Sequence, residues 1–387
     1  MKRKTMTVTA AAMILAMSIC ACGKDETPTT FTGDKTEEPK YQSNLNAISP
    51  SAYSEVEGLQ LEPGTYISII GKAEDAAYWE NVEKGVMQAA DDLNTVLGYT
   101  GNDKIKVTYN APAKTEDIDE QVNILDEELS RYPDVIGIAS VDADSGAVQF
   151  DLATANGIPV IALDSGNNYR GIQCTVETDN QDAARTGAYK LSDEIGGAGE
   201  VILLVQDSKS ETAKARTNSF VEEIEANHPD VSVVETIYCD KFEEKKKEIV
   251  EEKHKDKTAE EKTEEVKKLS DKDVLLYYLE KHPNLKGIFG TSASTTQMGL
   301  DVLRETKKID QVALMGFDVD KNLLTALKDG EIAGLIVQNP FGIGYASVIA
   351  AARTVLQVGN EAEVDTGYTW VTKENQESEA IQKMLYK

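Results

Sequence analysis

Two aspartates stand at the ends of short apolar runs, where a ligand could be bound. Asp164 ends the run that begins at Pro159, and Asp318 follows the run that begins at Val312. Ligands of open α/β sheets bind at the carboxyl ends of the strands, and a carboxylate there can accept hydrogen bonds from two neighbouring hydroxyl groups. Alternatively, both residues could have the purely structural role of a helix N-cap, a position that favours Asp.

Other residue types along the chain suit the same kind of polar ligand. Arg216 can donate a planar pair of hydrogen bonds, and the neighbours Tyr78 and Trp79 offer flat apolar faces. Gln338 ends a further apolar run and can both donate and accept. Arg216 could instead lie on a helix surface, and Trp79 could belong to a helix core.

Signatures of the common enzyme and cofactor sites are missing from the sequence. The chain contains no HExxH, GxSxG, CxxC or GxxxxGK pattern, and its three histidines, His228, His254 and His282, stand beside Pro or inside charged runs. Gly342-Ile-Gly344 begins like a dinucleotide-binding motif, but Ser347 occupies the third glycine position. We therefore predict no catalytic residue, no metal and no cofactor, and we expect that the protein is not an enzyme.

The first residues have the layout of a secretory signal. The basic residues 2–4 precede an uncharged run from Met6 to Ile19, and this run is too short to span a bilayer. The following Ile19-Cys20-Ala21-Cys22-Gly23 resembles a bacterial lipobox, which implies a signal peptide over 1–21 and a lipid on Cys22. The alternative is a cleaved signal with two incidental cysteines. The polar stretch that follows predicts a flexible tether over 22–60.

The charge balance limits the possible partners. The chain has 40 basic and 67 acidic residues, which gives a net charge of −27, or −30 once the three basic residues of the signal are removed. So acidic a body disfavours nucleic acid, whose phosphates require Lys and Arg, and disfavours lying flat on anionic lipid. Cys174 and Cys239 remain as thiols of the body, and the sequence does not decide whether they pair.

After the tether, short apolar runs alternate with segments of helical periodicity. This alternation predicts parallel sheets with helices on both faces, and it restarts at Val201, so the fold class is α/β with two doubly wound lobes. The predicted strands are 65–70, 105–109, 135–139, 158–163, 201–205, 231–238, 285–289 and 312–316. The predicted helices include 82–97, 122–129, 148–155 and 213–224, and Gly98 ends the first of these.

One segment differs in composition from the rest. Residues 241–272 contain eleven Lys and eleven acidic residues but very few apolar ones. Opposite charges three and four residues apart support a solvated helix or helix pair. We expect a surface insertion, and a site for docking a partner is the alternative.

From about Thr65 onward, a series of ordered motifs resembles the ribose- and galactose-binding family of bacterial substrate-binding proteins, the type 1 periplasmic binding proteins of ABC transporters. The motifs are Ala76-Ala77-Tyr78-Trp79, Asp134-Val-Ile-Gly-Ile138, Pro159-Val-Ile-Ala-Leu-Asp164, Ala215-Arg216, Gly287-Ile-Phe-Gly290, Met315-Gly-Phe-Asp318 and Ile336-Val-Gln338. The resemblance implies three crossovers, near Asp179, Gln338 and Gly367. It divides the body into an N-terminal lobe of 61–178 plus 339–366 and a C-terminal lobe of 179–338 plus 367–387.

The resemblance also implies a function. It predicts that a sugar or related polar solute binds in a cleft between the two lobes, which close on it by a hinge. The implied partners are an ABC permease and ATPase. The implied location is the outer face of the bacterial cytoplasmic membrane, where a lipid anchors the protein. A lipoprotein that presents its ligand to a sensor kinase or chemoreceptor is the alternative. The implied ligand-binding residues are Tyr78, Trp79, Asp164, Arg216, Ser292, Asp318 and Gln338. The family often has Asn in place of Ala76 and Ser292 and Arg in place of Ser165, so a ligand other than ribose is expected.

Overall fold

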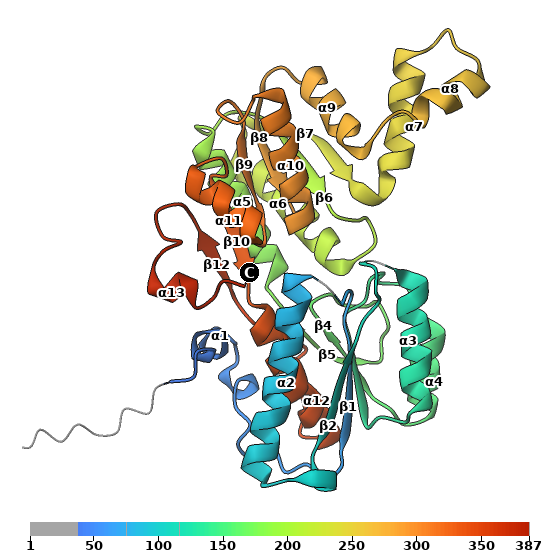
Figure 1. The fold of residues 1–387 in the computed structure, drawn as a ribbon, viewed down its shortest axis with the longest axis vertical. Coiled ribbons are helices and arrows are strands. Elements are labelled where there is room, and N and C mark those ends of the chain that lie inside the picture. Colours follow the sequence, from blue (N-terminus) through green and yellow to red (C-terminus); the bar gives the residue numbers. More distant parts are fainter. Residues whose placement is uncertain (1–37, 75, 116, 387) are drawn as a thin grey trace, which may run out of the picture. The chain divides into compact units, whose positions relative to one another are not determined.

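The computed structural model describes residues 38–74, 76–115 and 117–386. The predicted signal peptide and the predicted lipid site Cys22 lie outside the described residues. Residues 40–387 pack together as one unit that contains two six-stranded sheets (Figure 1). Within the described part of the chain, no helix is long and apolar enough to cross a membrane.

The first sheet forms the N-terminal lobe, and all of its strands are parallel. In spatial order its strands are β11 (Glu363–Asp365), β5 (Ile172–Glu177), β4 (Val160–Leu163), β3 (Val135–Ile138), β1 (Tyr66–Ile70) and β2 (Lys106–Asn110). Its helices are α2 (Ala77–Leu97), α3 (Ile118–Ser130), α4 (Ala147–Ala155) and α12 (Pro340–Val355), with the short turn η2 (Gly101–Asp103).

Alternate residues of the central strand β1 enter two different cores. Ile67 and Ile69 pack with α2 and α12, whereas Ile70 packs with α3 and α4 on the other face. Every residue of β1 is buried. A strand buried on both faces is nearly continuous in apolar residues, which explains why these strands appear in the sequence as short apolar runs. The buried Ser68 of β1 is the exception, and its hydroxyl donates to Glu128.

The second sheet forms the C-terminal lobe and repeats the same plan with one antiparallel edge strand, β12. Its spatial order is β12 (Tyr368–Val371), β10 (Gly334–Gln338), β9 (Ala313–Phe317), β8 (Leu285–Gly290), β6 (Gly199–Val205) and β7 (Val231–Tyr238). Its helices include α5 (Asn180–Glu194), α6 (Glu211–Asn227), α9 (Asp271–Lys281), α10 (Ala293–Thr306), α11 (Lys321–Asp329) and α13 (Glu379–Gln382). The prediction of two doubly wound lobes is confirmed.

The chain passes between the two sheets three times. It leaves β5 for α5 at 178–179, leaves β10 for α12 at 339, and leaves β11 for β12 at 366–367. These positions coincide with the crossovers that the resemblance implies. Each lobe is therefore assembled from segments that are distant in sequence.

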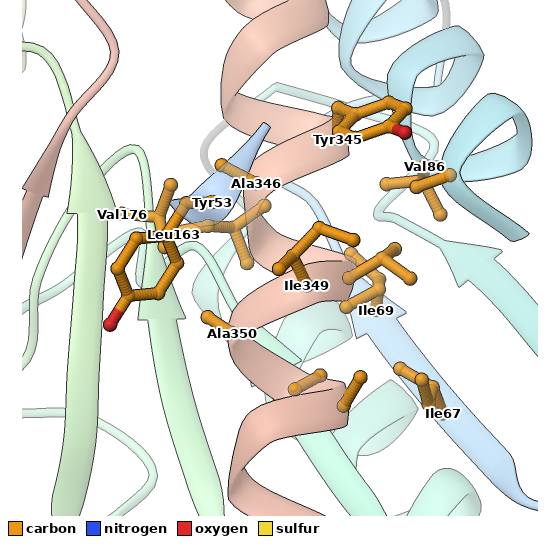
Figure 2. Close-up of a cluster of buried hydrophobic side chains, with 14 of the residues drawn as sticks. Tyr53, Ile67, Ile69, Val86, Leu163, Val176, Tyr345, Ala346, Ile349 and Ala350 are labelled. Carbon is orange, nitrogen blue, oxygen red and sulfur yellow. The ribbon is translucent and has the colours of Figure 1, made fainter. Parts of the chain in front are cut away.

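Helix α12 returns to the N-terminal lobe and lies against α2 at very close range. The close approach depends on two glycines: a Cβ at Gly85 would lie 2.1 Å from the Phe341 carbonyl oxygen, and one at Gly344 would lie 2.0 Å from that of Val82. Figure 2 shows the core beneath this contact, where Ile349 of α12 lies near Ile69 of β1.

The predicted tether is shorter than expected, because residues from about 40 onward belong to the body. The segment forms α1 (Gln42–Asn46) and η1 (Ser51–Tyr53). Tyr53 is fully buried in the N-terminal core, where Figure 2 shows it near Val176 and Leu163. The larger apolar residues Leu45, Ile48, Tyr53 and Val56 of this segment are buried, and the polar composition of the segment did not indicate this packing.

The charged segment 241–272 contains the turn η3 (Cys239–Lys241) at its border and two helices, α7 (Phe242–Lys253) and α8 (Ala259–Val266). Helix α8 buries no side chain and lies away from the strands at the outer end of this pair (Figure 1). Helix α7 differs from the expectation of a wholly solvated insertion, because Phe242 and Ile249 join the core of the C-terminal lobe. Only the α8 part of the segment is a surface insertion.

Candidate functional site

Asp164 and Asp318 occupy equivalent places in the two lobes. Asp164 follows β4 and Asp318 follows β9, each with a positive φ, of 57° and 67° respectively. Each backbone N–H donates to a carbonyl of the next strand, Val176 for Asp164 (2.8 Å) and Ile336 for Asp318 (2.7 Å). This backbone turn is tolerated by Asp better than by most residues. Neither aspartate is a helix N-cap, so this structural role is excluded for both. The N-cap of α11 is Asp320.

In the N-terminal lobe, Asp164 is bound by a tyrosine and faces a lysine. The Tyr78 hydroxyl donates to Asp164 Oδ1 at 2.5 Å, and Lys72 Nζ lies 3.7 Å from Asp164 Oδ2. Burial, together with the nearby carboxylate, raises the pKa of Tyr78 well above its usual value. The phenol therefore stays protonated and acts as a donor.

In the C-terminal lobe, Asp318 is bound in a similar way by a residue from the end of the chain. Gln338 Nε2 and the Tyr386 hydroxyl both donate to Asp318 Oδ1, each at 2.8 Å. Burial raises the pKa of Asp318, and the positive charge of Arg216 opposes that rise. Both aspartates are almost completely buried, so their carboxylate oxygens depend on these partners for hydrogen bonds.

Gln338 connects the two halves of the site. Its Oε1 accepts a hydrogen bond from Thr178 Oγ1 at 3.0 Å and lies 3.4 Å from the Tyr78 hydroxyl, while its amide group donates to Asp318. Gln338 lies at the second crossover, so one side chain contacts groups from both lobes. A change in the angle between the lobes would alter these contacts.

Arg216 of α6 points into the C-terminal lobe. Its Nε donates to Asn180 Oδ1 at 2.8 Å, its terminal N–H donates to the Thr291 carbonyl at 2.7 Å, and its guanidinium lies 4.1 Å from the centre of the Phe317 ring. The residue is 6% exposed, so it is not a surface helix residue. A guanidinium held on two neutral acceptors keeps N–H groups and positive charge for a ligand.

Two further predicted residues have evident structural roles. Trp79 is buried in the core of the N-terminal lobe, and its ring meets the Tyr78 ring edge-on at 5.2 Å. Ser292 is the N-cap of α10, where its Oγ accepts from the Thr295 amide in a capping box. Of the two aromatic residues, Tyr78 binds Asp164, and Trp79 packs against the Tyr78 ring from the core side.

Several residues around the site were not predicted from the sequence. Lys72 follows strand β1 by two residues, so the reasoning used for Asp164 would have found it. Ser165 Oγ is buried without a hydrogen-bond partner directly beside Asp164. Tyr386 gave no signal, because nothing local in the sequence shows that the C-terminal end returns to Asp318.

The three crossing segments are tied to one another and to the N-terminal segment. Asn339 Nδ2 donates to the Thr366 carbonyl at 2.9 Å and to the Asn44 carbonyl at 2.8 Å. The Asn44 side chain donates back to Asn339 Oδ1 at 2.9 Å. Short, hydrogen-bonded connections of this kind suit a hinge between two rigid lobes.

No group of three or more His, Cys, Asp or Glu side chains among the described residues has the arrangement of a metal site. The groups gathered here are instead two carboxylates, two cations, an amide and two phenols. Such a set can surround a ligand with many hydroxyl groups, because it offers both donors and acceptors. It contains no nucleophile paired with a base.

Comparison with known proteins agrees with this geometry. A family described as "Periplasmic binding protein domain" matches residues 67–360. The xylitol-binding protein of Mycolicibacterium smegmatis is 23% identical over 281 residues, covering 72% of this chain and 71% of the relative. The ribose import binding protein RbsB of Bacillus subtilis is 20% identical over 235 residues, covering 61% of this chain and 67% of the relative.

Solved structures show the same two-lobed fold. A carbohydrate transporter solute-binding protein from Agrobacterium radiobacter, in complex with D-arabinose, superposes with a TM-score of 0.67 at 26% sequence identity. The superposition covers 83% of this chain and 98% of that one. Because the family match extends over most of the body and the paired sheets agree with it, the chain belongs to the periplasmic binding protein family, the solute-binding components of ABC transporters.

Proposed function

We propose that the protein is the extracytoplasmic solute-binding component of an ABC importer and captures a neutral sugar or polyol of monosaccharide size between its lobes. The observation that carries the proposal is the pair of buried carboxylates, Asp164 and Asp318, one from each lobe. Each is held by a tyrosine hydroxyl at equivalent strand ends. A compound with several hydroxyl groups can donate to both.

The charges of the site favour a neutral ligand. The carboxylates of Asp164 and Asp318 are balanced by Lys72 and Arg216. Burial and neighbouring carboxylates raise the pKa of nearby Glu177 to about 8, so it is largely uncharged at neutral pH. A charged ligand would leave an uncompensated charge in a buried place, which is costly.

The size of the ligand is inferred from the relatives. Xylitol, ribose and D-arabinose, which appear in the names of three similar proteins, have five carbons, and D-fucose, which is bound in another similar structure, has six. A ligand of monosaccharide size is therefore expected. The relatives named are binding proteins and not enzymes, which supports the expectation of binding without turnover. The Ser165 hydroxyl beside Asp164 is a further group that could contact such a ligand.

Binding would close a hinge. A ligand that contacts Asp164 and Asp318 together binds the closed arrangement more tightly than the open one, and this difference in affinity shifts the population toward closure. Segments 178–179, 339 and 366–367 would take up the rotation. The closed form would then be the one that a permease recognises.

Attachment to the membrane through Cys22 is part of the proposal. The sequence around Cys22 supports a lipobox, and the described body begins near residue 40, so about 17 residues would link lipid and body. The variant Cys22→Ser is expected to leave the protein in the soluble fraction or unprocessed. An unmodified mature N-terminus at another residue, found by mass spectrometry, would exclude the anchor.

A thermal-shift screen tests the binding function. The full mature protein is heated with a library of pentoses, pentitols, hexoses and disaccharides, together with sugar acids as charged counterparts. One or more of the neutral pentoses, pentitols or hexoses is expected to raise the unfolding temperature in a saturable way. A response to sugar acids alone, or to no compound in the library, would contradict the proposal.

A further inference from the structure

The last fifteen residues of the described chain return from β12 to the space between the lobes. Asn375 Nδ2 donates to the Trp370 carbonyl at 2.9 Å, Gln382 Nε2 donates to the Gln376 carbonyl at 2.6 Å, and Lys328 pairs with Glu377 at 3.0 Å. Asn375 and Glu377 therefore fasten the segment to the C-terminal lobe, and the Gln382 bond stabilises the fold of the segment itself.

Tyr386 is the point at which this segment meets the site. It is 4% exposed, and its hydroxyl donates to Asp318 Oδ1. Its ring meets the Tyr78 ring edge-on, with centroids 5.7 Å apart and planes at 79°. Tyr78 belongs to the N-terminal lobe, so this aromatic pair connects the two lobes beside the two aspartates.

The hydrogen bonds to Asp318 use only one of its two carboxylate oxygens. Both Gln338 and Tyr386 donate to Oδ1, so among the described residues Oδ2 is the oxygen left to accept from a ligand hydroxyl. Burial raises the pKa of Tyr386 well above its usual value, which keeps the phenol a donor. Tyr386 thus orients the carboxylate and does not use up its acceptor capacity.

We propose that Tyr386 determines ligand specificity: the C-terminal segment supplies it as the aromatic wall of the ligand site in the C-terminal lobe, and it restricts the site to ligands of monosaccharide size. The proposal rests on the proposed function. Tyr386 also packs into the apolar core of that lobe together with the partly buried Ile381 and Leu385. A ring fixed in this way is a permanent wall and not a plug that the ligand must displace.

The test compares Tyr386→Ala and Tyr386→Phe with wild type by calorimetric titration of xylitol, D-arabinose and the disaccharide xylobiose. Tyr386→Phe keeps the wall but loses the hydrogen bond to Asp318, and is expected to weaken binding of xylitol and D-arabinose about tenfold. Tyr386→Ala removes the wall, and is expected to weaken these two ligands more and to shift the ratio of affinities toward xylobiose by at least about tenfold.

Two controls separate this effect from damage to the fold. Leu385→Ala shortens the neighbouring side chain of the same segment, and Tyr132→Ala removes a tyrosine that is 73% exposed elsewhere. Both are expected to keep the wild-type ratio of affinities. Thermal unfolding without ligand checks that every variant is folded.

Each outcome decides the proposal. Unchanged affinities in Tyr386→Ala would overturn it, and so would tighter binding of all ligands, because a displaced plug would produce that result. If Leu385→Ala shifts the ratio as much as Tyr386→Ala, the segment acts only through its packing. If the wild-type protein binds none of the three compounds, the proposed function fails and this proposal fails with it.

Discussion

The two halves of the site bind their aspartates in the same way but obtain their tyrosines differently. In the N-terminal lobe, Tyr78 comes from α2, which directly follows β1 of the same sheet. In the C-terminal lobe, Tyr386 arrives from the end of the chain, after the last crossover. Both aspartates have positive φ and follow equivalent strands.

This difference shows which part of the site the repeated fold supplies and which part is added. The strand order places Asp164 and Asp318 at matching positions, because both sheets are wound in the same sequence of strands. The helix after the first strand supplies a tyrosine in only one lobe. In the other lobe the C-terminal segment provides an equivalent hydroxyl and ring, those of Tyr386. The tyrosine of this half can therefore be replaced without altering the repeated fold.

The largest expected effect is the loss of either carboxylate. Asp164→Ala and Asp318→Ala should each weaken binding of xylitol or D-arabinose by about 30- to 150-fold, because each removes one partner of charge-assisted hydrogen bonds worth about 2–3 kcal/mol. Arg216→Ala should fall in the same range. Calorimetric titration measures the three affinities.

A matched control is Asp320→Ala, two residues beyond Asp318. Its carboxylate caps α11 by accepting from the Asn322 and Leu323 amides, so its loss should cost about 1 kcal/mol of stability and leave affinity unchanged. Affinities near wild type in both Asp164→Ala and Asp318→Ala would show that the ligand binds elsewhere.

A smaller effect is expected from the tyrosine hydroxyl of the N-terminal half. Tyr78→Phe keeps the ring against Trp79 and Tyr386 but removes the donor to Asp164. Ligand affinity should fall about tenfold, similar to Tyr386→Phe, if the two halves are energetically alike. A loss in only one of the two variants would mean that the ligand depends on one lobe.

Glu177, which lies beside the first crossing segment, should make the stability of the protein depend on pH. Glu177, at the end of β5, accepts from Asn180 Nδ2 at 2.9 Å, and Asn180 in turn accepts from Arg216. Its pKa rises from 4.5 to about 8 on folding, chiefly through burial and then through the charges of Asp164 and Glu363. Between these two pKa values the folded state holds a proton that the unfolded state releases. The stability of the protein should therefore fall as the pH rises from about 4.5 to about 8.

Glu177→Gln should remove much of that fall, because the amide mimics the protonated carboxyl group. Thermal unfolding of wild type and variant across the window measures the difference. Glu363→Gln is the informative companion, since it removes one charge that raises the Glu177 pKa and should move the fall to lower pH. Identical pH profiles for wild type and Glu177→Gln would contradict this account of the hinge.

The smallest effect is expected far from both halves. Replacing residues 256–267 with a short Gly-Ser linker removes α8, which buries no side chain, together with exposed ion pairs such as Lys267–Glu264 that are worth little. Affinity should stay within about twofold, because surface loops change in length at small entropic cost. A larger loss, with folding intact, would connect this segment to the site.

The sequence predicted well what depends on local pattern. The apolar runs identified the strands, and Asp164, Asp318 and Gln338 stand at strand ends as the sequence predicts. Their contact with a ligand stays a prediction. It failed where packing between distant segments decides the outcome. Tyr53 and Leu45 lie in a polar stretch yet bury completely or nearly so, and Tyr386 reaches Asp318 across 68 residues.

The interpretation of single residues shows the same limit. Trp79 is a residue type that suits stacking on a ligand, but its neighbour Tyr78 is the one that reaches Asp164. The two differ because one step along α2 rotates a side chain by about 100° around the helix axis. Ser292 stands at a strand end like Asp164, yet its hydroxyl caps α10. Side-chain direction, which depends on three-dimensional packing, separates these cases.

The central claim is that one ligand is held between Asp164 and Asp318, with Tyr78 and Tyr386 as the aromatic walls. A crystal structure of the protein grown with xylitol or D-arabinose tests it most directly. The account predicts ligand hydroxyls within hydrogen-bond distance of both carboxylates and the ligand in contact with both tyrosine rings. A ligand bound by one lobe alone, or at a site away from these four residues, would contradict it.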